Sequence, residues 1–192
     1  MGGMQDIPIV SFAAPDAWRE WLDANHAASG AVWLRIAKKD APTSSVSYAE
    51  ALDVALCYGW IDGKKIKGDE HSWLQSFGPR RPNGLWSKIN RDKVEALIAS
   101  GAMRPAGLAA IDHAKANGRW DAAYDSQANA TVPDDLQLAL DAEPAAAVHF
   151  VTISGQNRYA ILFRIQTAKK PETRASRIAQ FVAMLARGET IH

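Results

Sequence analysis

The sequence predicts an α+β fold, in which a small N-terminal sheet covered by helices continues into a mostly helical C-terminal half. Two observations predict it. In the first third of the chain, apolar residues recur alternately at periods of two and of about 3.6 residues, the periods of strands and helices. From residue 90 onward the helical period remains, interrupted by Pro and Gly. We expect residues 1–89 and 90–192 to pack as one globular unit, because the C-terminal helices are short and need a surface to pack against.

The first elements alternate between strand and helix. Residues 7–12 form a short strand candidate. A helix over 15–26 begins with a proline and turns Trp18 and Leu22 to one side. Residues 31–37 then alternate apolar and polar side chains, which predicts a half-buried strand.

A capping box marks the next helix. The Ser47 hydroxyl can accept a hydrogen bond from the Glu50 amide, while the Glu50 carboxylate reaches back to the Ser47 amide. After this helix, residues 60–67 and 71–77 read as two strands around a turn that contains Gly68. The sequence therefore predicts a hairpin that packs against the helices.

The C-terminal half is expected to be helical. Asn90 can cap a helix that ends at Gly101, and Pro105 opens another that stops at Gly118. The small and polar run 126–131 predicts an exposed linker. Further helices are expected after Pro133, after Pro144, over residues 156–168 and over residues 171–188.

Composition excludes several classes of protein. With 22 Lys and Arg against 21 Asp and Glu, the net charge of +1 gives no global attraction to nucleic acid, so nucleic-acid binding is the least favoured function. Cys57 is the single cysteine, which excludes an internal disulfide framework, and it continues the apolar stripe of its helix, which predicts a buried thiol. We expect no cofactor, because the sequence has no glycine-rich phosphate loop.

Metal binding and membrane insertion are not expected either. The five histidines never occur three or four residues apart, so no helix offers a pair of ligands to a metal. Asp69, Glu70 and His71 could hold a cation, but a charged turn is the commoner arrangement. The chain has no run of 18 apolar residues and no basic leader, so we expect no transmembrane segment and a cytoplasmic location.

Positive charge is concentrated in two segments. Residues 60–91 carry seven Lys or Arg against three Asp or Glu, and residues 164–192 carry six against two. In the first segment, Arg80 and Arg81 lie between two prolines, which restrict the backbone and reduce the entropy lost when the guanidiniums bind an anion. The other interpretation is a stiff loop whose arginines pair with acids such as Asp62 or Asp121.

The first basic segment also contains aromatic residues, a combination that suits an anionic ligand with a flat ring. The residues predicted to bind this ligand are Asp62, Arg80, Arg81, Trp86, Ser87 and Asn90. The second segment supplies a secondary basic patch of Lys169, Arg174 and Arg177, which is either a solvated helical face or a contact with an acidic partner.

Several ordered blocks of the sequence resemble the bacteriocin-protection, YdeI/OmpD-associated family. The resemblance extends over about residues 18–188 and implies a small bacterial protein of stress or toxin protection, with no catalytic residues to carry over. The blocks are Ala51-Leu52 with Leu56 to Gly63, Pro79 to Pro82, Trp86 to Lys88 with Asn90, Gly101 to Met103 with Pro105 to Gly107, Ala114-Lys115, Gly118 to Trp120 with Tyr124, and Ala168 to Arg174 with Arg177-Ile178.

The leading functional hypothesis is a non-enzymatic binding or protection protein, in which a basic and aromatic groove holds an anionic small molecule or an acidic peptide of a protein partner. A second hypothesis is an enzyme for a phosphorylated or carboxylated substrate, with Asp62 as the acid or base and the arginines stabilising negative charge. The third is binding of single-stranded nucleic acid, which predicts an affinity that falls steeply with salt.

Overall fold

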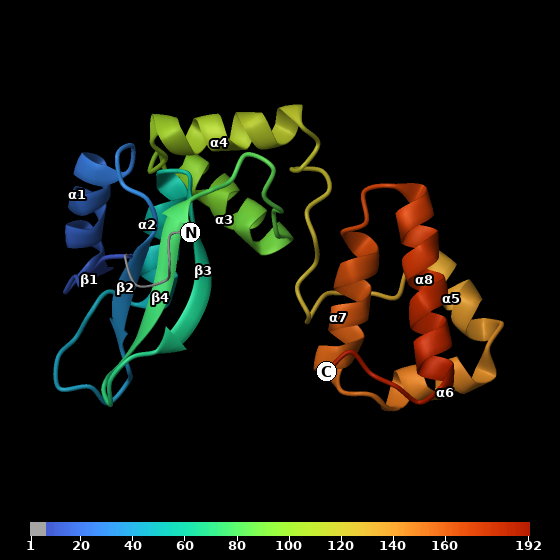
Figure 1. The fold of residues 1–192 in the computed structure, drawn as a ribbon. Helices are drawn as coiled ribbons and strands as arrows, with labels where there is room; N and C mark the ends of the chain where they lie inside the picture. Colours follow the sequence, from blue (N-terminus) through green and yellow to red (C-terminus); the bar gives the residue numbers. More distant parts are fainter. Residues whose placement is uncertain (1–6) are drawn as a thin grey trace. The chain divides into compact units, whose positions relative to one another are not determined.

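A computed structural model describes residues 7–192 and confirms the α+β fold (Figure 1). Its described residues fall into two compact units. Residues 7–84 and 90–121 form the first unit, and residues 85–89 and 122–192 form the second. Residues 85–89 thus belong to the second unit, although the segments before and after them belong to the first. The packing of the two halves into one globular unit remains a prediction.

The sheet and four helices precede residue 122. The expected strand over 7–12 is shorter in the structure, where β1 has two residues. The helix expected behind an Asn90 cap instead starts at Lys88, whose amide donates to the Tyr124 carbonyl oxygen at 2.9 Å. The elements are β1 (Ile9–Val10), α1 (Pro15–Asn25), β2 (Val32–Ala37), α2 (Tyr48–Cys57), β3 (Trp60–Lys67), β4 (Ser72–Pro79), α3 (Lys88–Ala99) and α4 (Pro105–Ala116).

The four strands form one sheet in the order β1-β2-β4-β3. β1 pairs with β2 in parallel, whereas β2 with β4 and β3 with β4 are antiparallel. The predicted hairpin is therefore confirmed, with a register shift between Asp62 and Lys65 that marks a bulge. β4 runs on to Pro79, so Arg80 is the first residue after the strand.

Aromatic rings fill the core of the first unit. Trp18 of α1 lies 5.9 Å from Phe77 and 6.2 Å from Trp60, measured between ring centroids. Phe77 pairs with Val32 across the ladder, and both side chains are buried. Since side chains alternate along a strand, Val32, Leu34 and Ile36 share this helix-covered face. Arg35 and Ala37 consequently lie on the opposite face of the sheet.

Two glycines allow α4 to approach α2 closely. A Cβ on Gly107 would lie 2.2 Å from the Cys57 carbonyl oxygen, which no side chain tolerates. Gly59 has a φ of 70° and faces the backbone of Ala106, so it needs the left-handed conformation as well as the space. The Arg104 amide donates to the same Cys57 oxygen at 3.0 Å. The start of α4 is thereby fixed to the end of α2.

The second unit is built mainly of helices, as predicted (Figure 1). The expected linker 126–131 lies in the loop before its first helix. Its helices are α5 (Asp134–Asp141), α6 (Pro144–Thr152), α7 (Gly155–Gln166) and α8 (Pro171–Ala186). Its core is mostly aliphatic and includes Leu136, Leu140, Ile161, Ile165, Ile178 and Leu185.

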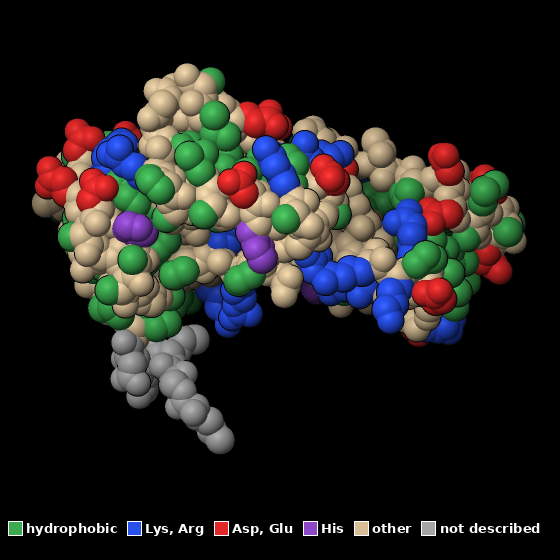
Figure 2. All heavy atoms as spheres, turned by 90° about the horizontal axis from the view of Figure 1, so that it is seen from above, with side chains coloured by type: hydrophobic (Ala, Val, Ile, Leu, Met, Phe, Trp, Pro, Cys, Tyr) green, Lys and Arg blue, Asp and Glu red, His purple; other side chains and the backbone are tan. Residues whose placement is uncertain are grey.

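The surface carries charges of both signs. Figure 2 shows Lys and Arg side chains interspersed with Asp and Glu on the face seen from above. Neither positive nor negative side chains dominate that face, which agrees with the net charge of +1. Within residues 7–192, none of the helices combines the length and the hydrophobicity needed to span a bilayer.

Candidate functional site

The residues predicted to bind the ligand divide between the two units. The first unit holds Asp62, Arg80, Arg81 and Asn90. The second unit holds Trp86 and Ser87. Their assembly into a single groove therefore remains a prediction.

Asp62 is tied to a neighbouring helix. It lies on β3 just before the bulge, opposite Phe77. The Tyr48 hydroxyl, at the first residue of α2, donates to Asp62 Oδ2 at 2.8 Å. The carboxylate is thus held by the helix that the sequence predicted to begin there.

The first basic segment does not form one patch in space. Trp60 pairs with Pro79, next to the arginines, whereas Lys67 pairs with Trp73 at the other end of the ladder. Seven residues of strand separate the two ends by about 20 Å. Lys64 lies in the bulge, and Lys65 and Lys67 follow it toward the hairpin turn, so Lys67 lies too far away to share a small ligand with Arg81.

Hydrogen bonds hold the loop that carries Arg81. Its two ends are fixed, because the Arg80 amide donates to the Gly59 carbonyl oxygen at 2.9 Å and the Gly84 amide donates to the Arg81 carbonyl oxygen at 2.8 Å. Asn117 Nδ2, at the end of α4, donates to the Pro82 carbonyl oxygen at 3.0 Å. Arg81 itself is exposed, and its guanidinium makes no hydrogen bond or ion pair with another residue in the described part of the chain.

Two further cations lie at the same end of α4. The Arg91 guanidinium carbon lies 5.1 Å from the centroid of the Trp120 ring, and Lys115 Nζ lies 5.3 Å from it. Arg91 Nη1 also donates to the Trp120 carbonyl oxygen at 2.9 Å. Asn117 bonds this end of α4 to the carbonyl oxygen of Pro82, the residue after Arg81. We call Arg81, Arg91 and Lys115 the Arg81 surface.

The Arg81 surface differs in membership from the sequence prediction. Arg91 belongs to the basic segment but was not among the predicted binding residues, and Lys115 lies in a segment that is acidic overall. A helix-capping asparagine that bonds to a loop 35 residues earlier leaves no local signal, so sequence reasoning had no means of placing Lys115 there. Asp121 makes no ion pair with a described residue, so the expected internal pairing with Arg81 does not occur there.

Trp86 and Ser87 contact Tyr124, near the start of the segment 122–192 of the second unit. Trp86 is buried, and its carbonyl oxygen accepts from the Tyr124 amide at 2.9 Å. Ser87 forms a β-bridge with Tyr124. Next to it, Lys88 Nζ lies 2.7 Å from Asp125 Oδ1, and this lysine is the main reason that the pKa of Asp125 is lowered.

The secondary basic patch is largely committed to the fold. Arg174 donates to both oxygens of Asp135, at 2.6 and 2.8 Å, and to the Ile165 carbonyl oxygen at 3.1 Å. This bidentate hydrogen bonding lowers the pKa of Asp135 and raises that of Arg174. Arg177 donates to the Arg164 carbonyl oxygen, while Lys169 is exposed.

The remaining sequence candidates have structural partners. Cys57 is buried as predicted, and burial raises the pKa of its thiol. In the turn between β3 and β4, Asp69 Oδ2 lies 2.5 Å from Nη1 of Arg35 on β2. Sequence reasoning missed this pair, although the alternation of β2 already separates Arg35 from Leu34 and Ile36. Among residues 7–192, no three His, Cys, Asp or Glu side chains gather as a metal site.

Comparison with known families divides the chain in a way that the sequence resemblance did not. Residues 10–110 match the family model described as Domain of unknown function (DUF8412). Residues 129–188 match the model described as Bacteriocin-protection, YdeI or OmpD-Associated (OmdA). The recognised family is confirmed, but its match begins at residue 129 and not near residue 18. No curated protein and no solved structure matches the chain.

Proposed function

We propose that this chain, which belongs to the family described as Domain of unknown function (DUF8412), binds an acidic peptide segment of a partner protein at the Arg81 surface. The model of that family spans more than half of the chain. The observation that carries the proposal is the exposed guanidinium of Arg81, which has no partner among the described residues. Its loop is bonded by Asn117 to the end of α4, where Arg91 and Lys115 lie against Trp120.

The restricted backbone of the loop favours binding by Arg81. Prolines at positions 79 and 82 fix two backbone angles, and the hydrogen bond from Asn117 holds the loop to α4. An arginine on such a loop loses less conformational entropy when it meets a carboxylate. Arg81 can then offer two parallel N–H donors to one Asp or Glu side chain.

The second and third cations extend the surface for a peptide. Arg91 is oriented by the carbonyl oxygen and the ring of Trp120, and Lys115 lies over the same ring. Three positive side chains from a loop and two helices suit successive carboxylates along an extended segment. Arg80 and Asn90 belong to the same unit, and the proposal does not depend on Asp62, Trp86 or Ser87.

The alternative of acid–base catalysis has less support. The Asp62 carboxylate accepts a hydrogen bond from Tyr48, and no ion pair joins it to Arg81. A binding role also agrees with the match of residues 129–188 to a bacteriocin-protection family, because protection can be exerted by capturing another protein.

Fluorescence anisotropy with a labelled ten-residue Asp/Glu-rich peptide tests the proposal on the full chain. We expect binding that weakens with added salt, and a loss of roughly five-fold for Arg81→Gln and for Lys115→Gln, because one exposed ion pair contributes up to about 1 kcal/mol. Lys67→Gln is the matched control, since Lys67 is equally exposed but lies at the far end of β3.

Two results would overturn this function. One is an affinity for the acidic peptide that is the same in Arg81→Gln, Lys115→Gln and Lys67→Gln. The other is tighter binding of a single-stranded oligonucleotide than of the peptide at equal salt. Melting temperatures of all three variants within about 2 °C of the unchanged chain would confirm that only binding is being compared.

A further inference from the structure

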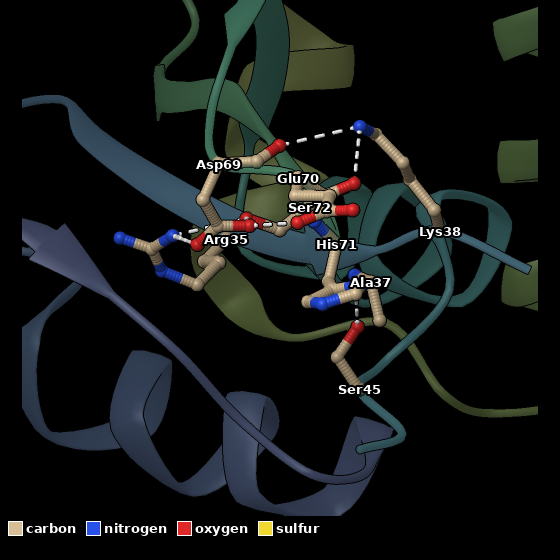
Figure 3. Close-up of polar contacts among 8 residues, drawn as sticks. All are labelled: Arg35, Ala37, Lys38, Ser45, Asp69, Glu70, His71 and Ser72. Atoms are coloured by element: carbon tan, nitrogen blue, oxygen red, sulfur yellow. Dashed lines mark hydrogen bonds and ion pairs between the residues drawn. The ribbon is translucent and has the colours of Figure 1, made fainter. Parts of the chain in front are cut away.

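A second site lies on the sheet face opposite the helices, where a cavity of about 210 Å³ opens beside Arg35. Its walls come from β2, from the loop over residues 41–45, from Ser11 after β1 and from the β3–β4 turn. Figure 3 shows Arg35, Asp69 and Ser72 joined by hydrogen bonds, with Ser45 bonded to Ala37 nearby.

One side of the Arg35 guanidinium is held rigidly. Nη1 donates to Asp69 Oδ2 at 2.5 Å and to Ser72 Oγ at 2.9 Å. Ser72 Oγ in turn donates to Asp69 Oδ1 at 2.8 Å, and the His71 amide donates to the same oxygen at 3.0 Å. The hydrogen bond from Ser72 is the main cause of the lowered pKa of Asp69, so this carboxylate stays ionised at neutral pH.

The other side of the guanidinium is available. Nε and Nη2 of Arg35 make no hydrogen bond with any residue among 7–192. These two nitrogens form the edge of an arginine that matches the two oxygens of a carboxylate. Because Nη1 is fixed, this edge is already oriented before a ligand arrives, which lowers the entropy cost of binding.

Hydroxyl groups complete the lining. Ser45 Oγ is used, since it accepts from the Ala37 amide at 2.8 Å and lies 3.0 Å from the Val46 carbonyl oxygen. The hydroxyls of Ser11, Thr43 and Ser44 line the cavity without a hydrogen bond to another described residue. They can donate to or accept from the hydroxyl groups of a ligand.

Lys38 holds the turn in place. Its Nζ donates to the carbonyl oxygens of Asp69 and Glu70, at 3.2 and 2.7 Å, and its amide donates to the His71 carbonyl oxygen at 2.8 Å (Figure 3). The turn that carries Asp69 is therefore bound to the strand that carries Arg35. Hydrogen bonds from two strands and the turn therefore hold Arg35, Asp69 and Ser72 together.

We infer that this cavity binds a small hydroxylated carboxylate through the Nε and Nη2 edge of Arg35. The volume is below the range of about 300–1,000 Å³ typical of sites for drug-sized molecules, which favours a ligand of few atoms. Asp69 already offsets the charge of Arg35, so a singly charged carboxylate suits the site better than phosphate, which carries between one and two negative charges at neutral pH. This inference stands independently of the Arg81 surface.

Titration of the isotope-labelled full chain by NMR tests the inference, with lactate, gluconate, inorganic phosphate and sorbitol as probes. We expect gluconate and lactate to shift the amide resonances of residues 41–45 and the Nε–H resonance of Arg35. Phosphate should act at least ten-fold more weakly, and neutral sorbitol should have no effect at the same concentration. Phosphate binding more tightly than both carboxylates would overturn the inference, as would shifts outside the lining residues.

Variants separate binding from folding. Arg35→Lys keeps the charge but loses the two-nitrogen edge, so we expect gluconate affinity to fall at least ten-fold. Thr43→Val together with Ser44→Ala removes ligand contacts that the fold does not use, and we expect a loss of three-fold or more with an unchanged melting temperature. Equal gluconate affinity in the unchanged chain and in the Thr43→Val, Ser44→Ala variant would contradict the site even if Arg35→Lys failed to fold.

Discussion

Two arginines of the second unit, Arg158 and Arg174, contact the fold differently from Arg35 and Arg81 of the first. In the second unit, Arg174 donates to Asp135 and to a backbone carbonyl oxygen, and Arg158 donates to the carbonyl oxygens of Val151 and Ile153. In the first unit, Arg81 has no such partner among the described residues, and Arg35 uses one of its three nitrogens. The difference supports the proposals that Arg81 and Arg35 bind ligands, whereas Arg174 and Arg158 stabilise the second unit.

This contrast shows why charge counted along a sequence is a poor guide to binding. Residues 60–91 and 164–192 each carry an excess of four positive charges. The first segment is divided in space, with Lys65 and Lys67 on β3 toward the hairpin turn and Arg91 with Lys115 against Trp120 at the end of α4. In the second segment, Arg174 and Arg177 donate to carboxylate and carbonyl oxygens of neighbouring helices, and Arg164 donates to a carbonyl oxygen of its own helix.

The largest loss of stability is expected from a change in the packing of α4, which carries Lys115, against α2. Gly107→Ala would place a Cβ against the Cys57 carbonyl oxygen, so α4 must move away from α2. We expect the free energy of unfolding to fall by about 2 kcal/mol, in the range of overpacked cores, with a loss of acidic-peptide binding. Chemical denaturation measures the first and anisotropy the second. Gly30→Ala is the control, because nothing lies within 4 Å of its Cβ position.

A smaller loss of stability should separate the two kinds of arginine. Arg174→Gln leaves Asp135 without its bidentate partner and breaks the bond to the Ile165 carbonyl oxygen. We expect a destabilisation of about 1 kcal/mol, since the pair is partly exposed, against less than about 0.5 kcal/mol for Arg81→Gln. Urea unfolding of both variants gives the comparison. Equal losses would mean that Arg81 also supports the fold.

Part of this fold could be predicted from local patterns alone. The capping box of Ser47 and Glu50 is present in full, because both hydrogen bonds lie within one helical turn. Pro15, Pro105, Pro144 and Pro171 each begin a helix, since a first-turn residue needs no amide hydrogen. The hairpin and its turn follow from alternation.

The site could not be predicted in the same way, because its contacts join distant residues. Arg35 meets Asp69 across the sheet, and Asn117 reaches Pro82 from another helix. Neither pair leaves a periodic signal. The prediction that α3 begins after Asn90 was wrong for a similar reason. The Lys88 amide donates to the carbonyl oxygen of Tyr124, which is 36 residues away in the sequence.

The smallest expected effect is the change in stability at acidic pH that results from protonation of Asp135. Hydrogen bonds from Arg174 lower the pKa of Asp135 below its ordinary value of 3.8, so its stabilising contribution is complete above that value and is lost as the pH falls through the lowered pKa. The difference in unfolding free energy between the unchanged chain and Asp135→Asn should therefore be constant above pH 5 and shrink below pH 4. Asp69 and Asp125 titrate in both proteins and cancel. A difference that grows on acidification would contradict the assignment.

The most direct test of the contrast between the units is to observe the arginine Nε–H resonances of one labelled sample while the acidic peptide is added. Bound and free guanidiniums in both units are then reported side by side. We predict that the resonances of Arg81 and Arg91 shift together along one binding curve, while that of Arg174 stays in place. A shift of Arg174 with Arg81 unchanged would show that the second unit, and not the first, presents the binding surface.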